Sequence, residues 1–248
     1  MNWEDNMFVI LMMIAASVLA ALFLVVRVTF GKRSLKGGIF AMYAKALASL
    51  GFIMVGVFGI YQGVDNIQAA VIVLFGLIMG LVGDIVLDLK VVYDGREEEG
   101  TYLTGGIVSF AIGHIMFFIA ILLFLADTQF IAGKLIGISV AVSVAFTALI
   151  MLVGKFVMKF DFGKFIIHSC IYAFMLTFMS AFTIALLIVM DTTIMLPFAI
   201  GMILFLLSDI VLTQMYFGGQ KKNSILCIIN HVLYYAAQIS IASFICLM

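Results

Sequence analysis

The chain has 248 residues, of which 66% are hydrophobic and only 10% are charged, and its formal net charge is zero. This composition excludes an ordinary soluble domain and predicts an integral membrane protein. The charged residues form no long basic or acidic run, so we expect no nucleic acid partner.

A membrane-spanning helix needs about 20 mainly apolar residues, and such stretches follow one another along the whole chain. We therefore expect a single all-α integral membrane domain, 1–248, without a soluble part. The first stretch follows Glu4 and Asp5 and has no basic region before it, which indicates a retained helix and not a cleaved signal peptide. The eight expected transmembrane helices are 7–28, 38–61, 67–89, 103–125, 131–153, 164–190, 193–216 and 224–247.

The basic residues predict how this bundle is oriented. Cytoplasmic connections of membrane proteins are rich in Lys and Arg. The connections after the first, third, fifth and seventh expected helices hold eleven basic residues, whereas the opposite side holds only Lys134. We therefore expect both termini to lie outside. We also expect the protein to be an integral protein of a bacterial cell membrane. The eleven residues are Arg27, Lys32, Arg33, Lys36, Lys90, Arg96, Lys155, Lys159, Lys164, Lys221 and Lys222.

The tetrapeptide Asp-Ile-Val-Leu occurs twice, beginning at Asp84 in the third expected helix and at Asp209 in the seventh. Each of these helices is followed by one that carries a histidine, His114 or His231. This pattern indicates two parallel four-helix repeats related by an axis along the membrane normal. A carboxylate inside a membrane is costly and marks a candidate functional site.

Further polar residues lie at similar depth in the expected bundle. Several are about five to eight residues from the cytoplasmic helix ends, or roughly 8 to 12 Å below the surface, and others lie one or two turns deeper. This clustering predicts a polar cavity that opens toward the cytoplasmic leaflet. The outer group is Lys45, Asp84, Tyr172, Asp209 and His231, and the deeper group is His114, Tyr235 and Gln238.

Four segments and two single residues carry a resemblance to a known family. The chain resembles the YhhN family of membrane proteins, whose animal members are lysoplasmalogenases. It departs from the family pattern at Ala46, where proline is frequent, and at His231, which lies outside that pattern. The segments are Gly83-Asp84-Ile85-Val86-Leu87, Gly105 to His114, Ser208-Asp209-Ile210-Val211-Leu212 and Tyr234-Tyr235-Ala236-Ala237-Gln238, and the single residues are Lys45 and Tyr172.

The resemblance implies hydrolysis of the 1-alkenyl ether bond of a lysoplasmalogen, a lysophospholipid held in the membrane. Asp84 and Asp209 are then the catalytic residues, one as a protonated acid and one as a carboxylate that stabilises the cation and activates water, as in glycosidases. Which of the two is the acid is left open, and we expect no metal or cofactor. The supporting or substrate-binding residues are Lys45, His114, Tyr172, Ser208, Tyr235 and Gln238.

The sequence is also compatible with other functions and with other roles for these residues. Lys45 is either an anchor for the substrate phosphate or the structural ion-pair partner of an aspartate. Three histidines with aspartates could bind zinc, although no HxxxH or HExxH spacing occurs. The carboxylates could instead form the relay of a proton-coupled carrier, or the protein could bind lysolipids without turnover. The headgroup, the chain length and the oligomeric state are left open.

Overall fold

The computed structural model describes residues 3–31, 34–92, 99–126, 133–190, 193–221 and 223–248. Within these residues eight long helices are each apolar enough to cross a membrane, and no strand occurs. The predicted all-α bundle is therefore confirmed, with helix ends within four residues of those expected. The helices are α1 (Trp3–Thr29), α2 (Leu35–Tyr61), α3 (Ile67–Val92), α4 (Glu99–Ala126), α5 (Gly133–Leu152), α6 (Ile166–Met190), α7 (Leu196–Phe217) and α8 (Ser224–Ile245).

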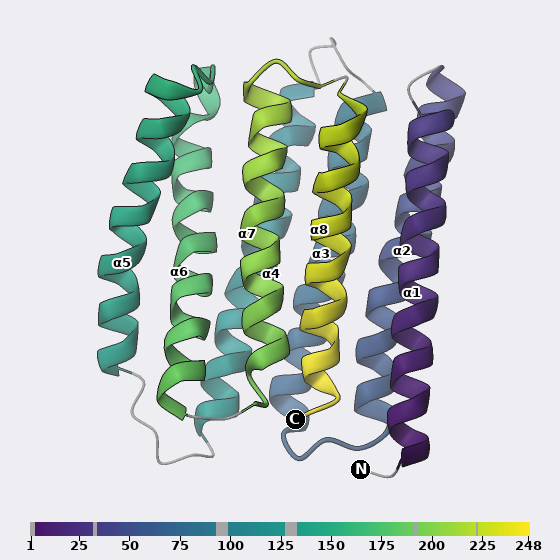
Figure 1. Cartoon of the computed structure of the whole chain (residues 1–248), viewed down its shortest axis with the longest axis vertical. Coiled ribbons are helices and arrows are strands. Elements are labelled where there is room, and N and C mark those ends of the chain that lie inside the picture. The colour runs from purple at the N-terminus through teal and green to yellow at the C-terminus, as the bar shows by residue number, and fades with distance from the viewer. Residues whose placement is uncertain (1–2, 32–33, 93–98, 127–132, 191–192, 222) are drawn as a thin grey trace.

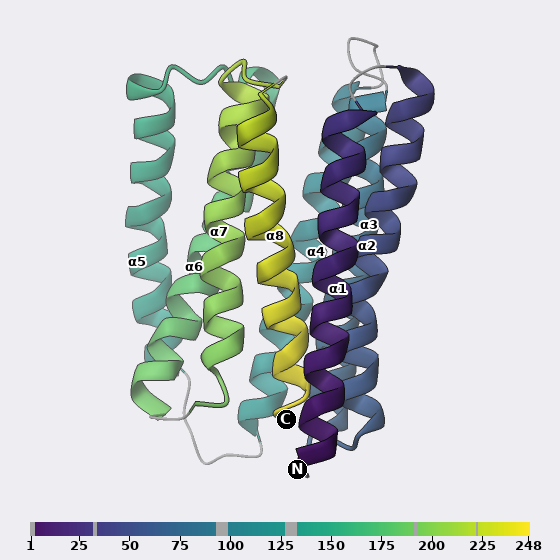
Figure 2. The same ribbon diagram turned by 45° about the vertical axis from the view of Figure 1, so that its right-hand side comes forward.

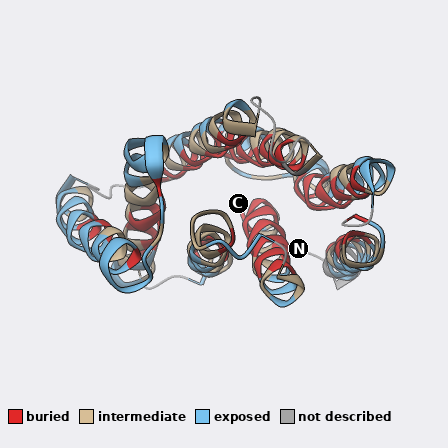
Figure 3. Cartoon of the chain, turned by 90° about the horizontal axis from the view of Figure 1, so that it is seen from above, coloured by how far each residue is buried: buried red, intermediate tan, exposed pale blue. Residues whose placement is uncertain are grey.

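The helices form an arc with a filled inner side. In the order α1, α2, α3, α4, α6 and α5, each helix packs against the next, and α7 and α8 lie inside the arc (Figures 1 and 3). α8 contacts α1, α2, α3 and α7, so it is the central helix of the bundle. Both chain ends lie at the same end of the bundle, which is the lower end in Figures 1 and 2.

The contacts between helices agree with the predicted repeat. If the two halves are repeats, α1 to α4 correspond to α5 to α8. Each contact in the first half then has a counterpart: α1–α2 corresponds to α5–α6, α2–α3 to α6–α7, and α3–α4 to α7–α8. The contact between halves, α2–α8, corresponds to α6–α4, and all of these contacts occur. The first helices of the two halves differ, because α1 also packs against α8 whereas α5 packs mainly against α6. The common origin of the two halves stays a prediction.

Glycine lets helices pack closely in each half. Gly76 of α3 and Gly201 of α7 each lie eight residues before the aspartate of the repeated tetrapeptide. A Cβ atom on Gly113 of α4 would lie 3.1 Å from the carbonyl oxygen of Gly76 in α3. A Cβ atom on Gly201 of α7 would lie 2.9 Å from the carbonyl oxygen of Ala237 in α8. Small residues that let backbones approach are a general device of membrane bundles, and here they hold the two aspartate-bearing helices against their partners.

Local signals set the starts of the helices around the site. Ser34 caps α2 by accepting a hydrogen bond from the Gly37 amide at 3.1 Å. Asn223 caps α8 through the amides of Ile225 and Leu226 at 3.0 and 3.2 Å. Pro197 lies in the first turn of α7, where its missing N–H has no helical partner to lose.

Three basic residues that we assigned to connections lie within the long helices, Arg27 in α1, Lys36 in α2 and Lys90 in α3, and two of them are buried. α1 and α3 continue through Arg27 and Lys90, whose exposed fractions are only 6% and 4%. The burial has a physical reason, because each cation has an anionic partner: Arg27 pairs with Asp88, and Lys90 pairs with Glu99. Both residues remain at the expected end of the bundle, so the asymmetry in basic residues is unchanged.

Candidate functional site

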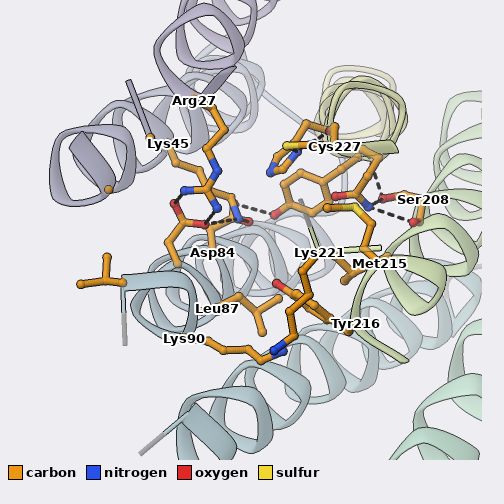
Figure 4. Close-up of a pocket in the computed structure, with 18 of the residues that line it drawn as sticks. Arg27, Lys45, Asp84, Leu87, Lys90, Ser208, Met215, Tyr216, Lys221 and Cys227 are labelled. Carbon is orange, nitrogen blue, oxygen red and sulfur yellow. Dashed lines mark hydrogen bonds and ion pairs between the residues drawn. The ribbon is translucent and has the colours of Figure 1, made fainter. Parts of the chain in front are cut away.

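A buried ion-pair network joins α1, α2 and α3. Lys45 Nζ lies 3.0 Å from Asp84 Oδ1 and 3.4 Å from Asp88 Oδ1. Arg27 Nη1 lies 3.1 Å from Asp88 Oδ2. Figure 4 shows the Arg27 and Lys45 side chains beside Asp84. Two cations thus compensate two carboxylates, which a membrane interior requires.

Hydroxyl groups complete the surroundings of Asp84. Ser49 donates to Asp84 Oδ2 at 2.6 Å, and Tyr234 donates to the same oxygen at 2.8 Å. Gln238 Nε2 in turn donates to the Tyr234 hydroxyl at 3.0 Å. Asp84 therefore accepts two hydrogen bonds and pairs with an ammonium group, so it is held rigidly by groups from α2 and α8.

Asp209 has different surroundings. Tyr172 of α6 donates to Asp209 Oδ2 at 2.7 Å. Among the described residues, no cationic side chain lies within 4.0 Å of Asp209. The two aspartates of the repeated tetrapeptide are thus chemically unlike: Asp84 faces a cation, and Asp209 faces a phenol.

Both aspartates line one cavity of about 600 Å³ between α1, α2, α3, α4, α7 and α8. Its walls carry equal numbers of positive and negative side chains, so the cavity is polar but formally neutral. The cations are Arg27, Lys45, Lys90 and Lys221, and the anions are Asp84, Asp88, Glu99 and Asp209. We call this space the charged cavity.

Two lysines of the charged cavity converge on one carboxylate. Lys221 Nζ lies 2.6 Å from Glu99 Oε1, and Lys90 Nζ lies 3.6 Å from the same oxygen. Lys90 also lies over the Tyr216 ring, 3.5 Å from its centroid. In Figure 4 the Lys90 and Lys221 side chains point toward each other. A pair of ammonium groups that shares one carboxylate is suited to bind a phosphate group.

A second cavity, of about 500 Å³, adjoins the first and is almost wholly apolar. It lies between α3, α4, α5, α6 and α7, and we call it the apolar cavity. Asp209 lines both cavities. This carboxyl group therefore lies where a polar compartment meets a hydrocarbon-like one.

Other residues predicted for the site lie around the cavities or behind them. Ser208 lines the charged cavity, but its hydroxyl is used in a contact with Asn230 of α8, whose Nδ2 donates to Ser208 Oγ at 2.9 Å. Tyr235 is not among the cavity-lining residues and donates to the Lys45 carbonyl at 3.2 Å. Gln238 contacts the site through its hydrogen bond to the Tyr234 hydroxyl. The hydrogen bonds of these three residues therefore hold neighbouring parts of the site in place.

The two predicted histidines differ in position. His114 is buried outside both cavities, where Nδ1 hydrogen-bonds to the Phe110 carbonyl at 2.7 Å and the ring packs 6.0 Å from the Tyr172 ring. His231 lines the charged cavity, and its Nδ1 bonds to the Cys227 carbonyl at 2.7 Å. Within the described ranges, no group of three or more His, Cys, Asp or Glu side chains is arranged to hold a metal ion.

Several members of the site were given no role from the sequence. Asp88 and Ser49 follow Asp84 and Lys45 by four residues, so each shares a helix face with a predicted site residue; this spacing placed Asp88 on the inward face of its helix without assigning it a partner. Arg27 gave no such signal, because its role depends on contact between α1 and α3. That Lys90, near the end of α3, and Lys221, in the connection before α8, share the Glu99 carboxylate likewise becomes visible only in three dimensions.

Fold and site together define an eight-helix, multi-pass membrane protein with buried aspartates that line an intramembrane cavity. The chain belongs to the YhhN family, because the sequence model of that family matches residues 10–245, nearly its whole length. The resemblance seen in the sequence is thereby confirmed. Comparisons with curated proteins and with solved structures found no match.

Proposed function

We propose that the protein is a lysoplasmalogenase-type hydrolase, which cleaves the 1-alkenyl ether bond of a single-chain phospholipid to a fatty aldehyde and a glycerophospho-alcohol. The observation that carries the proposal is the pair of unlike aspartates on one cavity, Asp84 with its ammonium partner and Asp209 with only a phenol. Vinyl ether hydrolysis needs one proton donor and one fixed negative charge, and this pair supplies both.

Proton transfer to carbon begins the reaction. Asp209 delivers its proton to the alkenyl carbon that is beta to the ether oxygen, and the C=C electron pair forms the new C–H bond. The other alkenyl carbon and the oxygen become an oxocarbenium ion. Water then attacks the cationic carbon through its oxygen atom, and the Asp209 carboxylate takes a proton from that water. In the resulting hemiacetal the C–O bond to the glycerol breaks: the departing oxygen takes the proton held by Asp209 and leaves as the alcohol, while the hemiacetal hydroxyl returns a proton to Asp209 and becomes the aldehyde carbonyl. One water is consumed.

Asp84 provides the fixed negative charge. Its hydrogen bonds from Ser49 and Tyr234 and its contact with Lys45 leave it poorly placed to exchange protons. A preorganised carboxylate, already fixed by its hydrogen-bond partners, stabilises a developing cation without reorganising. The division of labour in the proposed reaction is therefore acid and base at Asp209, and electrostatic stabilisation at Asp84.

The substrate phosphate binds between Lys90 and Lys221. These ammonium groups already share the Glu99 carboxylate, and a phosphate brings more acceptor oxygens than that carboxylate does. Lys45 is occupied by two buried aspartates, so its role in the proposed site is to compensate their charge. The phosphate is thus held at the outer part of the charged cavity, with the ether bond deeper.

A comparison of two lipids tests the proposal. Purified protein is incubated with a 1-alkenyl lysophosphoethanolamine and with its 1-alkyl counterpart of the same chain length, and free aldehyde is measured. We expect aldehyde from the alkenyl lipid alone, because only the vinyl ether can be protonated at carbon. Folded protein that releases no aldehyde from either lipid would overturn the proposal and favour the carrier or lipid-binding alternatives.

A further inference from the structure

The apolar cavity has almost no polar lining, although it touches the charged cavity along a shared wall. Most of its lining side chains are aliphatic or aromatic, from Leu103 on α4 to Leu226 on α8. The residues that line both cavities are Leu87, Phe110, Asp209, Leu212 and Tyr216. Asp209 thus belongs to the wall between the two compartments, and a molecule that occupied both would pass this carboxyl group.

The walls of the apolar cavity come partly from α6 and from the turn after α5. Ala173 is a small lining residue on α6, whereas Gly154, in the π-helix that follows α5, would place a Cβ atom 3.0 Å from the Phe160 ring. The turn after α5 closes one side, since the Phe160 amide bonds to the Gly154 carbonyl at 2.8 Å and the Asp161 amide bonds to the Phe217 carbonyl at 3.0 Å. A short π-helix, Val153–Val157, makes this turn possible.

The chemistry of the two compartments selects the ligand. Burying polar groups without partners in the apolar cavity would be costly, so its occupant is a hydrocarbon. Burying a second hydrocarbon chain among Arg27, Lys45 and Asp84 would remove water from charged groups, so the charged cavity takes the polar part of the same molecule. One chain and one polar head satisfy both conditions.

We propose that the apolar cavity is the chain-binding subsite of a single-chain phospholipid whose head occupies the charged cavity. The inference rests on the proposed function for the identity of the lipid, and it adds where the chain lies. Asp209 then faces the bond at the junction of head and chain, which is the ether bond of a lysoplasmalogen. A diacyl lipid has no compartment for its second chain.

Cross-linking of an uncleavable lipid maps the subsite on the unaltered protein. A 1-O-alkyl lysophosphoethanolamine with a diazirine at the end of a 16-carbon chain is photolysed with the protein, and labelled peptides are identified by mass spectrometry. We expect labels on cavity-lining residues of α5 and α6, such as Leu149, Ile150 and Leu176, and we expect excess unlabelled alkyl lysolipid to suppress them. Labels confined to residues that line neither cavity would overturn the proposal.

A matched pair of variants on α6 tests whether the lipid chain occupies the apolar cavity. Ala173→Phe fills the apolar cavity, whereas Ile171→Phe changes a side chain that is 58% exposed and lines neither cavity. Displacing two or more methylenes should weaken binding of the 16-carbon alkyl lysolipid to Ala173→Phe by about tenfold or more. Ile171→Phe should bind as the unaltered protein does. Equal affinity of the two folded variants would contradict the proposal.

The outcomes separate this inference from the proposed function. Both experiments use a lipid that the proposed reaction cannot cleave, so they report binding alone. Labels on residues of the apolar cavity, together with no aldehyde release from alkenyl lipids, would support the chain-binding subsite and exclude the proposed hydrolase activity. Aldehyde release with unlabelled cavity residues would support the hydrolase and remove the subsite.

Discussion

Asp84 and Asp209 begin the same tetrapeptide, but their neighbours give them separate chemistry. Lys45, Ser49 and Tyr234 hold Asp84 as one member of a charge-compensated network. Asp209 has the Tyr172 hydroxyl and an open position on two cavities. The sequence predicts that both residues matter, whereas the difference between them arises from partners on other helices.

Replacing the proposed proton donor should abolish most of the activity while the fold remains. Asp209→Asn keeps the volume and the acceptor for Tyr172 but cannot deliver a carboxylic proton. We expect aldehyde release to fall by about 10²- to 10⁴-fold, measured as kcat with the alkenyl lipid. Tyr172→Phe is the control, because it leaves the carboxyl group in place and should fall less. A folded Asp209→Asn protein with near-normal kcat would exclude Asp209 as the acid.

Lys45 should matter for stability more than for substrate affinity. In Lys45→Met the cation of Arg27 alone faces two buried carboxylates. Breaking a buried pair in this way costs about 3 to 5 kcal/mol, so the melting temperature in detergent should fall clearly.

A second substitution provides the control for that prediction. Asp84→Asn in the Lys45→Met background removes the uncompensated charge and keeps an acceptor for Ser49. We expect this double variant to regain much of the lost melting temperature. A Lys45→Met protein that melts normally but binds lysolipid weakly would instead support the phosphate-anchor role.

At the scale of elements, the existence of each helix could be predicted from apolar length, but the pairing of helices could not. Ser139, Ser143 and Thr147 of α5 are buried and recur every four residues, and the Thr147 hydroxyl lies 3.0 Å from that of Thr177 on α6. Such a stripe indicates a packed face without naming its partner. The placement of α7 and α8 inside the arc likewise depends on contacts between distant segments.

Close packing of α7 on α8 should be sensitive to one methyl group. A Cβ atom at Gly201 would lie 2.6 Å from Ile241 Cγ1 and 2.9 Å from the Ala237 carbonyl oxygen. Gly201→Ala should therefore destabilise the protein by about 1 to 3 kcal/mol, seen as a lower melting temperature. Gly137→Ala on α5 meets no atom within 4 Å and should not lower it. Equal melting temperatures for both variants would contradict the packing described for α7 and α8.

At the scale of the whole molecule, the charged cavity is lined by Arg27, Lys90 and Lys221, near the C-terminal ends of α1, α3 and α7. These helix ends lie opposite the two termini (Figure 1). The excess of basic residues at the site end predicts that this end faces the cytoplasm. Reporters fused to either terminus should therefore behave as external, and a reporter inserted after Lys221 should behave as cytoplasmic. A terminus that reports from the cytoplasm would reverse the leaflet from which substrate enters, although it would leave the chemistry of the site unchanged.

The central claim is that a carboxylic acid of the protein protonates an alkenyl carbon, and deuterium labelling measures this step. The alkenyl lipid is hydrolysed in D₂O, the aldehyde is trapped at once, and its deuterium content is measured by mass spectrometry. Authentic aldehyde incubated in D₂O is the control for exchange with solvent. We predict one deuterium on the carbon next to the carbonyl group, and almost no labelled product from Asp209→Asn. Aldehyde that carries no more deuterium than the exchange control would contradict the account.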